Sequence, residues 1–324
     1  MADFIQTASN DTGESLTPYL AYEPRSTVAY GVGGGFAALA VASLVTALLA
    51  RAYMFTLVAG SAASTMVAQF MRGSLASSSG SMEMYQATLA LETAGANGLL
   101  LTASLMLGRW LRFVDGRLRA TAVLAGGIGV LAAIGAAALE CISMALVFDK
   151  GADLQRIGHQ LAIAGAAATL GGSICGLVST AWKAGSAARH MGTEVAALAL
   201  PFALLSIWGA HALAQVKLPL RNVANSSELA FYLLSVLPPG LVLVVWLGLN
   251  VPRRFSFARQ ERAQGGIDNS LYEYPETEAS DASLKSPRML GAQDIHRHST
   301  MEAEMYPHHK SQYAVDSKDD LRHL

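Results

Sequence analysis

The stretch ATAVLAGGIGVLAAIGAAALECISMALVF, from Ala120 to Phe148, carries a single charged side chain, that of Glu140. A helix needs about 20 mostly apolar residues to cross a hydrocarbon core of about 30 Å, because each residue advances it by about 1.5 Å. The strands of a transmembrane barrel would be about half as long and would alternate in polarity. The stretch is therefore predicted to be a membrane-spanning helix.

Six further stretches of the 324-residue chain have the same character. A backbone polar group without a partner costs several kcal/mol in lipid, so each stretch is expected to be helical. We predict an all-α fold, a polytopic bundle of seven transmembrane helices. The predicted spans are Thr27–Ala50, Tyr53–Met71, Met84–Leu107, Ala120–Phe148, Ile157–Trp182, Val195–Gln215 and Leu229–Val251.

The composition of the whole chain agrees with a membrane domain. It is 52% hydrophobic and 15% charged, with a mean hydropathy of +0.35, whereas soluble proteins have about 45–50% apolar and about 25% charged residues. The formal net charge of −1 excludes a polybasic nucleic-acid binder. No Gly-x-x-x-x-Gly-Lys-Ser/Thr loop occurs, so ATP-driven pumping is not expected.

The segments that flank the predicted bundle are polar. Residues 1–26 lack the basic start and apolar run of a cleavable signal peptide, and are predicted to form an extracellular or lumenal leader before the transmembrane domain at 27–252. Residues 253–324 combine low hydrophobicity with many Ser, Glu, Asp and Lys residues. Such a composition predicts a disordered cytosolic tail, which could recruit cytosolic partners.

The Lys and Arg residues between the spans predict the orientation, because cytosolic connections are enriched in them. Eleven lie on the side of the tail, namely Arg51, Arg109, Arg112, Arg117, Arg119, Lys183, Arg189, Arg253, Arg254, Arg259 and Arg262. Six lie on the side of the leader, namely Arg25, Arg72, Lys150, Arg156, Lys217 and Arg221. We expect an outside amino terminus, a cytosolic tail and residence in the plasma membrane. Sequons for N-glycosylation at Asn10 and Asn225 fall on the outer side.

Small residues, aromatic residues and cysteines give further expectations. Gly31-x-x-x-Gly35 and Gly172-x-x-x-Gly176 predict close helix packing. Pro238-Pro239 predicts a kink or a late start of the seventh helix. Cys141 and Cys175 should differ in depth by more than about 10 Å and remain free thiols. Four aromatic residues near span ends are expected to be interfacial anchors, namely Tyr53, Trp110, Trp182 and Trp246.

Polar residues inside the spans are the candidate functional residues, because charged groups at mid-bilayer are costly and should face the bundle interior. Glu92 and Glu140 are each predicted to lie about 12 Å below the outer surface. Gln69, His159 and His211 are expected within about one turn of the outer ends, and Asn97 deeper. One interpretation is an outward-facing hydrated cavity in which the two carboxyl groups hold a cationic amine or share one proton. The other is a set of structural hydrogen bonds.

Two segments carry a family resemblance, NGLLLTASLMLGRWLRFVDG at 97–116 and SSELAFYLLSVLPPGLVLVVWLGLNVPRRF at 226–255. They resemble the fungal lipid-translocating exporters, an RTA-like family of seven-span proteins. The family pattern at the end of the third span is matched by Gly108, Arg109 and Asp115. Its other patterns are matched by Tyr22 and Pro24 in the leader, by Gly158, Ile163 and Gly165 in the fifth span, and by Glu228, Phe231, Tyr232, Leu237, Pro238, Pro252 and Arg253 in and after the last. The family's acidic residue about two turns before Arg72 is absent near Thr65.

The resemblance implies export of, or resistance to, amphipathic lipids such as sphingoid long-chain bases or sterol amines, with membrane lipids as partners. No enzyme activity, cofactor or metal is expected. A receptor-like or sensor protein that signals through its tail is the alternative, although Asp-Arg-Tyr and Asn-Pro-x-x-Tyr motifs are missing. A minor alternative is a ceramidase-like zinc hydrolase that uses His159, His211 and one glutamate.

Overall fold

The computed structural model describes residues 25–77, 81–114, 119–147, 151–187, 192–217 and 227–255. Six of its long helices are α2 (Ser26–Leu49), α3 (Thr56–Ser77), α4 (Met82–Val114), α5 (Arg119–Val147), α6 (Ala152–Ala187) and α7 (Gly192–Lys217). The seventh span is composite: α9 (Glu228–Phe231), the π-helical turn η2 (Tyr232–Val236) and α10 (Leu237–Gly248). Two short elements, η1 (Tyr53–Phe55) and α11 (Val251–Arg254), complete this part of the chain.

Seven helices in the described residues are long and apolar enough to cross a membrane, so the predicted all-α, seven-span fold class is confirmed. The chain is a multi-pass membrane protein. Several predictions fall outside the described residues: the glycosylation sites Asn10 and Asn225, the family positions Pro24 and Asp115, most of the leader and almost all of the tail.

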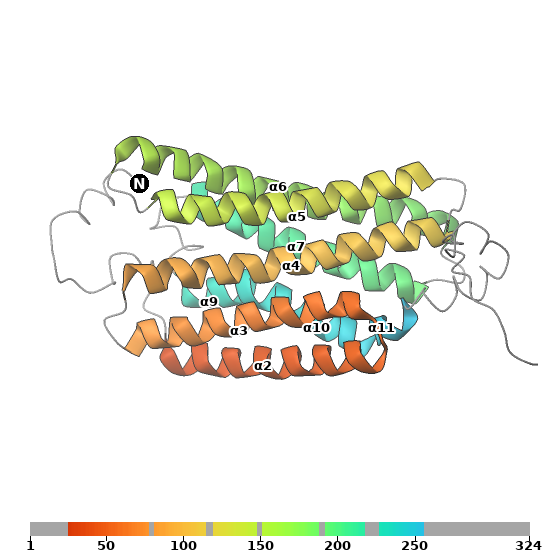
Figure 1. The fold of residues 1–324 in the computed structure, drawn as a ribbon, viewed down its shortest axis with the longest axis horizontal. Helices are drawn as coiled ribbons and strands as arrows, with labels where there is room; N and C mark the ends of the chain where they lie inside the picture. Colours follow the sequence, from red (N-terminus) through yellow and green to blue (C-terminus); the bar gives the residue numbers. More distant parts are fainter. Residues whose placement is uncertain are drawn as a thin grey trace, which may run out of the picture. The chain divides into compact units, whose positions relative to one another are not determined.

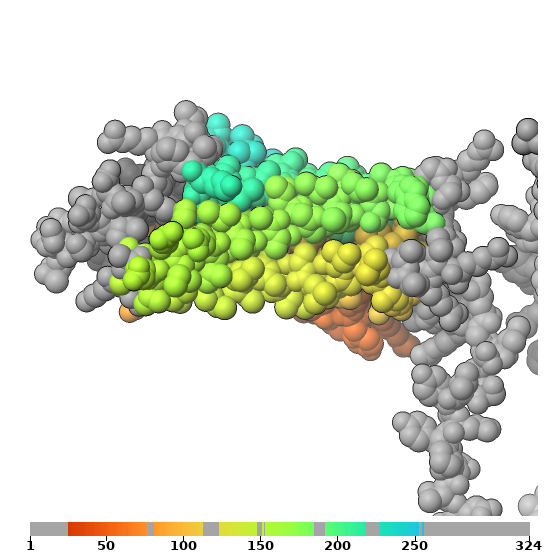
Figure 2. Space-filling view, turned by 90° about the horizontal axis from the view of Figure 1, so that it is seen from above, coloured from red at the N-terminus to blue at the C-terminus, as the bar shows by residue number. Residues whose placement is uncertain are grey.

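Each helix from α2 to α7 packs against the next one along the chain. Figure 1 shows these neighbours running in alternating directions, with the seventh span returning beside α2, α3 and α4. We call the end where α2 begins at Ser26 the leader end, and the end where α10 stops at Gly248 the tail end. Figure 2 shows one outer face, built by α5, α6 and α7. Exposed aliphatic side chains of α5, such as Leu131 and Ile134, suit contact with lipid tails.

Several helices extend beyond the predicted spans, and their additional turns contain charged residues. Arg109 and Arg112 belong to the last turns of α4, and Lys183 belongs to α6. Arg72, which was predicted to lie in a connection between spans, lies inside α3 and is only 3% exposed. The prediction was wrong here because a span was ended at its first charge, whereas a helix accommodates a charge that finds a partner.

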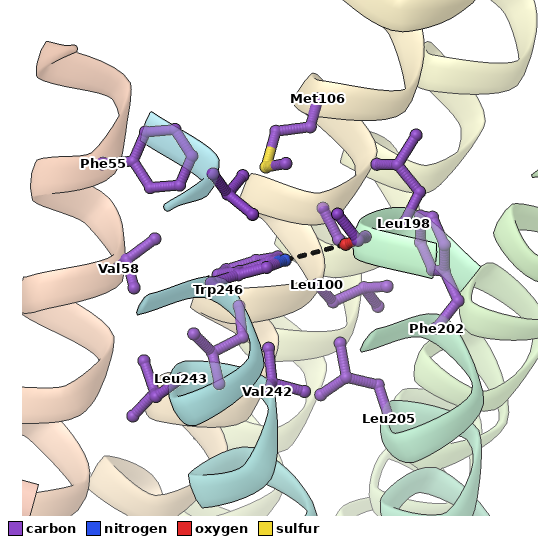
Figure 3. Close-up of a cluster of buried hydrophobic side chains, with 14 of the residues drawn as sticks. Phe55, Val58, Leu100, Met106, Leu198, Phe202, Leu205, Val242, Leu243 and Trp246 are labelled. Atoms are coloured by element: carbon purple, nitrogen blue, oxygen red, sulfur yellow. Dashed lines mark hydrogen bonds between the residues drawn. The ribbon is translucent and has the colours of Figure 1, made fainter. Parts of the chain in front are cut away.

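An apolar core fills the tail half of the bundle (Figure 3). Trp246 of α10 lies at its centre and is 1% exposed. Its indole Nε1 donates a hydrogen bond of 3.0 Å to the carbonyl oxygen of Ala197 in α7, so the polar atom is satisfied without water. The residues around it come from η1, α3, α4, α7 and α10, and include Phe55, Val58, Leu100, Met106, Leu198, Phe202, Leu205, Val242 and Leu243.

Two of the four predicted interfacial anchors are part of this core instead. Trp110 and Trp246 are each 1% exposed, whereas Tyr53 and Trp182 are exposed as expected. Trp246 can be buried because Ala197 accepts its only polar hydrogen. At Pro238-Pro239, where a kink or a late start was predicted, a π-helical turn immediately precedes α10, whose first turn contains the prolines.

One of the two glycine pairs packs as predicted. A Cβ atom on Gly172 would meet Ala132 at 2.8 Å, and one on Gly176 would overlap the ring of Phe202. The pair in α2 was predicted wrongly, because Gly31 and Gly35 have nothing within 4 Å and face outward. Cys141 and Cys175 are free thiols, as predicted.

The backbones of α4 and α5 approach each other closely at Gly108 and Gly126. A Cβ atom on Gly126 would lie 2.8 Å from the Cα atom of Gly108, and backbone atoms cannot turn aside as a side chain can. We predict that Gly126→Val lowers the free energy of unfolding by about 1–3 kcal/mol, because the added atoms force the helices apart. Gly127→Val is the matched control, since Gly127 has nothing within 4 Å.

The measurement is the midpoint of thermal unfolding in detergent, followed by size-exclusion chromatography. An equal effect of the two substitutions would contradict the helix contact.

Candidate functional site

Two groups of buried polar side chains lie in the leader half of the bundle. The first, which we call the Arg72 cluster, consists of Gln69 and Arg72 on α3, Glu92 on α4 and Phe231 on α9. The second, which we call the Glu140 cluster, consists of Thr93 and Asn97 on α4, Glu140 on α5 and Thr169 on α6. The sequence predicted four of these eight residues as candidates.

Glu92 is held by three hydrogen bonds from Arg72. The Nη2 atom of Arg72 donates to both carboxylate oxygens at 2.9 Å, and its Nε atom donates to Oε1 at 3.1 Å. Gln69 adds a bond of 3.0 Å from Nε2 to the same oxygen. Gln69 is 0% exposed, and the two charged side chains are 4% and 15% exposed. The opposite charges therefore compensate each other inside the bundle, which a buried charge requires.

The guanidinium group of Arg72 also connects to the seventh span. It lies over the ring of Phe231, 4.0 Å from the ring centroid, in a cation–π contact. Tyr232 follows at the start of η2, within electrostatic range of Arg72 and Glu92. Its buried hydroxyl and the Oε1 atom of Gln69 have no hydrogen-bond partner among the described residues. The Arg72 cluster thus joins α3, α4 and the first turn of the seventh span.

Thr65 lies where α3 and α4 are in tight contact. Thr65 donates a hydrogen bond of 3.2 Å to the carbonyl oxygen of Ser61. Its Oγ1 atom occupies the place that a Cβ atom on Gly95 would take. The tight contact between α3 and α4 leaves little room for a longer side chain at Thr65, and the carboxylate that pairs with Arg72 is on α4, three residues before Gly95.

The Glu140 carboxylate is surrounded by neutral groups. Asn97 donates from Nδ2 to Oε2 at 3.2 Å, and Thr93 is its second side-chain hydrogen-bond partner. Thr169 donates at 2.9 Å to the Oδ1 atom of Asn97, which fixes the orientation of the amide. Glu140 is 5% exposed. Gly165 on α6 packs against its side chain, and an added Cβ atom would lie 2.5 Å from Cγ of Glu140.

The two glutamates therefore differ in charge compensation. Glu92 has an arginine, whereas Glu140 forms no ion pair within the part of the chain that the structure describes. They also use hydrogen-bond partners from different helices: Gln69 and Arg72 of α3 donate to Glu92, and Asn97 of α4 donates to Glu140. A bare carboxylate in an apolar interior is very costly, so Glu140 needs either a proton or a cation close to it.

The remaining predicted residues are His159 and His211. His211 on α7 is buried, and its Nε2 atom has no partner among the described residues. His159 on α6 is partly exposed. Gln69, His159 and His211 lie six to eight residues from their helix ends, which is about two turns rather than the predicted one. The helices are longer than the apolar runs that defined the predicted spans.

The zinc site proposed for His159, His211 and a glutamate is not formed. Among the described residues, no three His, Cys, Asp or Glu side chains are close enough to hold a metal ion. The histidines belong to different helices, and the carboxylates have other partners.

Arg72, Thr93 and Thr169 were not predicted as members of the site, and Phe231 was named only as a family position. Arg72 follows Gln69 by three residues, so the two share a helix face, and this spacing is the signal that could have identified it. Thr93 and Asn97 are four residues apart on α4 and share a face in the same way. Thr169 gives no such signal, because it stands among small apolar residues.

The residues that carry the family resemblance have structural partners in several cases. Gly108 forms the contact with Gly126, and Gly165 forms the contact with Glu140. Glu228 accepts a bond of 2.8 Å from the backbone N–H of Arg25 and pairs with its side chain. Pro238 is buried in the first turn of α10, and Arg109 is exposed on α4.

Compared with known protein families, curated proteins and solved structures, the chain gives no match.

We predict that Arg72→Leu lowers the free energy of unfolding by about 3–5 kcal/mol, because it leaves the carboxylate of Glu92 buried and unpaired. The double variant Arg72→Leu/Glu92→Leu should recover most of this loss, since no charge is left in the apolar interior. Thermal unfolding of the single and double variants in the same detergent measures the coupling. Additive losses would show that the pair is not formed in the folded protein.

Proposed function

We propose that this membrane protein moves amphipathic lipid amines, of the sphingoid-base or sterol-amine class, between the leaflets of its bilayer without ATP hydrolysis. The activity is movement rather than chemical conversion, and it needs neither a metal nor a cofactor. In the proposed setting, the plasma membrane, the leader is outside and the tail is cytosolic. The resemblance to lipid-translocating exporters and the buried carboxyl group of Glu140 support the proposal.

Glu140 is the observation that carries it. A lipid amine is a cation with an apolar tail, and a carboxylate without an internal cation is the group that would bind it. Asn97 and Thr93 hold the carboxylate by hydrogen bonds, so it is positioned before a ligand arrives. Glu92 is not equivalent, because Arg72 already occupies both of its oxygens.

The distribution of polarity along the bundle supports a site reached from the leader end. Both polar clusters lie in the leader half, whereas the Trp246 core fills the tail half. The amine of a bound lipid would lie at Glu140, and its tail would extend along the exposed aliphatic surface of α5 and α6. Movement to the other leaflet would require the Trp246 core to open.

The test uses proteoliposomes and a long-chain base labelled with a fluorophore on its tail, whose exposure on the outer leaflet is followed by dithionite quenching. Wild-type protein should accelerate the exchange between leaflets. Glu140→Gln should reduce the protein-dependent rate at least about tenfold, because loss of one partner of a buried charge pair costs more than about 1.4 kcal/mol. Glu83→Gln, an exposed glutamate in the first turn of α4, is the control and should leave the rate unchanged.

Exchange that does not depend on the protein would exclude lipid movement. A tail-dependent cellular response with unchanged exchange would favour the sensor interpretation instead.

A further inference from the structure

Glu140 is buried without an opposite charge beside it among the described residues, and this matters most when no amine is bound. Its carboxyl group is 5% exposed, all of its side-chain partners are neutral, and it lies in a bundle solvated by lipid. When no lipid amine is bound, the negative charge has no partner among the described residues. The free-energy cost of burying this carboxyl group is low in only two states: with a proton bound to it, or with a cation beside it.

We propose that Glu140 exchanges a proton for a lipid amine, so that the proton gradient drives the amine movement. This inference rests on the proposed function and adds its source of energy. In the unloaded site the carboxyl group carries the proton on one oxygen. When the amine binds, the O–H bond breaks, the proton leaves to water at the leader end, and the carboxylate pairs with the ammonium group. The site has no net charge before and after the exchange.

The coupling between proton movement and amine movement follows from the states of Glu140 that are high in free energy. A carboxylate with neither ligand would carry a bare charge through the apolar half of the bundle, which is the most costly state. A carboxyl group cannot hold a proton and an ion pair with the amine together, since its charge is lost when it is protonated. Changes in access from one side to the other are therefore expected only with one of the two ligands bound.

The other titratable groups on the packed elements do not replace Glu140 in this role. The helices packed against α5 are α4 and α6. In the leader half, α4 contributes Glu83, Tyr85 and Glu92; Glu83 is exposed in the first turn, and Glu92 is paired with Arg72. From α6 come Asp153, Arg156 and His159, near its first two turns and at least six residues before Gly165, which contacts Glu140. On α5 itself, Cys141 faces outward.

The Arg72 cluster differs from the Glu140 cluster because its carboxylate has an ion-pair partner. Its carboxylate is neutralised by a permanent cation in every state, so binding of a ligand there need not involve a proton. The difference between the two clusters is the reason for assigning exchange to Glu140 rather than to Glu92.

The test measures proton release when a lipid amine binds to the full-length protein in nanodiscs. The probe is hexadecyltrimethylammonium, which has no proton of its own, so any proton released comes from the protein. Calorimetric titration in two buffers of different ionisation enthalpy gives the number of protons per amine, with empty nanodiscs as the blank. The number should approach about one as the pH is lowered and fall toward zero as the pH is raised.

Glu140→Gln should abolish the proton release, and Glu83→Gln should leave it unchanged. Glu140→Asp is the second variant, because it keeps a titratable carboxyl group and should retain release even if the amine binds more weakly. Binding to wild-type protein without proton release at any pH would overturn the exchange while leaving the proposed function intact. Release that persists in Glu140→Gln would also overturn it. Absence of binding to the wild type would overturn the proposed function together with the exchange.

Discussion

The constraint on which the rest of the structure depends is that a charge surrounded by hydrocarbon must be neutralised. The leader half of the bundle contains a buried glutamate, Glu140, and a partly buried one, Glu92, and the two charges are compensated differently. Glu92 is compensated by Arg72 from the neighbouring helix, with Gln69 as an additional donor. Glu140 has only Asn97 and Thr93, which stabilise a carboxyl group without cancelling its charge. The first arrangement holds helices together, and the second leaves a place for a ligand with one positive charge.

The seventh span is held by polar contacts near the leader end and by apolar packing near the tail end. Arg72 joins α3 to α4 through Glu92 and to the seventh span through Phe231. The seventh span is irregular at this level, because the π-helical turn begins one residue after Phe231 and the two prolines follow it. Toward the tail end the same span becomes regular, and Trp246 fixes it to α7. The leader half thus contains one glutamate with an ion-pair partner and one without, and it lies next to an apolar tail half.

The amino-acid sequence predicted the seven spans well, because the length of an apolar run is fixed by the thickness of the membrane. It predicted less well which side of a helix faces inward. In α2 nearly every residue is apolar, so Gly31 and Gly35 looked like a packing face although Gly33 is the glycine that contacts Phe70. The sequence also did not show which residue pairs with a buried charge. Arg72 was counted as a loop residue, because its neighbour Glu92 is 20 residues away in sequence. Likewise, the burial of Trp246 depends on a carbonyl group 49 residues away.

The central claim is that Glu92 is an ionised, paired carboxylate and that Glu140 is neutral until a cation binds. Infrared difference spectroscopy of the reconstituted protein measures this directly, through the carbonyl stretch that only a protonated carboxylic acid has. The account predicts such a band in the protein without ligand, its loss in Glu140→Gln, and its replacement by carboxylate bands when hexadecyltrimethylammonium binds. A band that survives Glu140→Gln, or a spectrum that does not change when the amine binds, would contradict it.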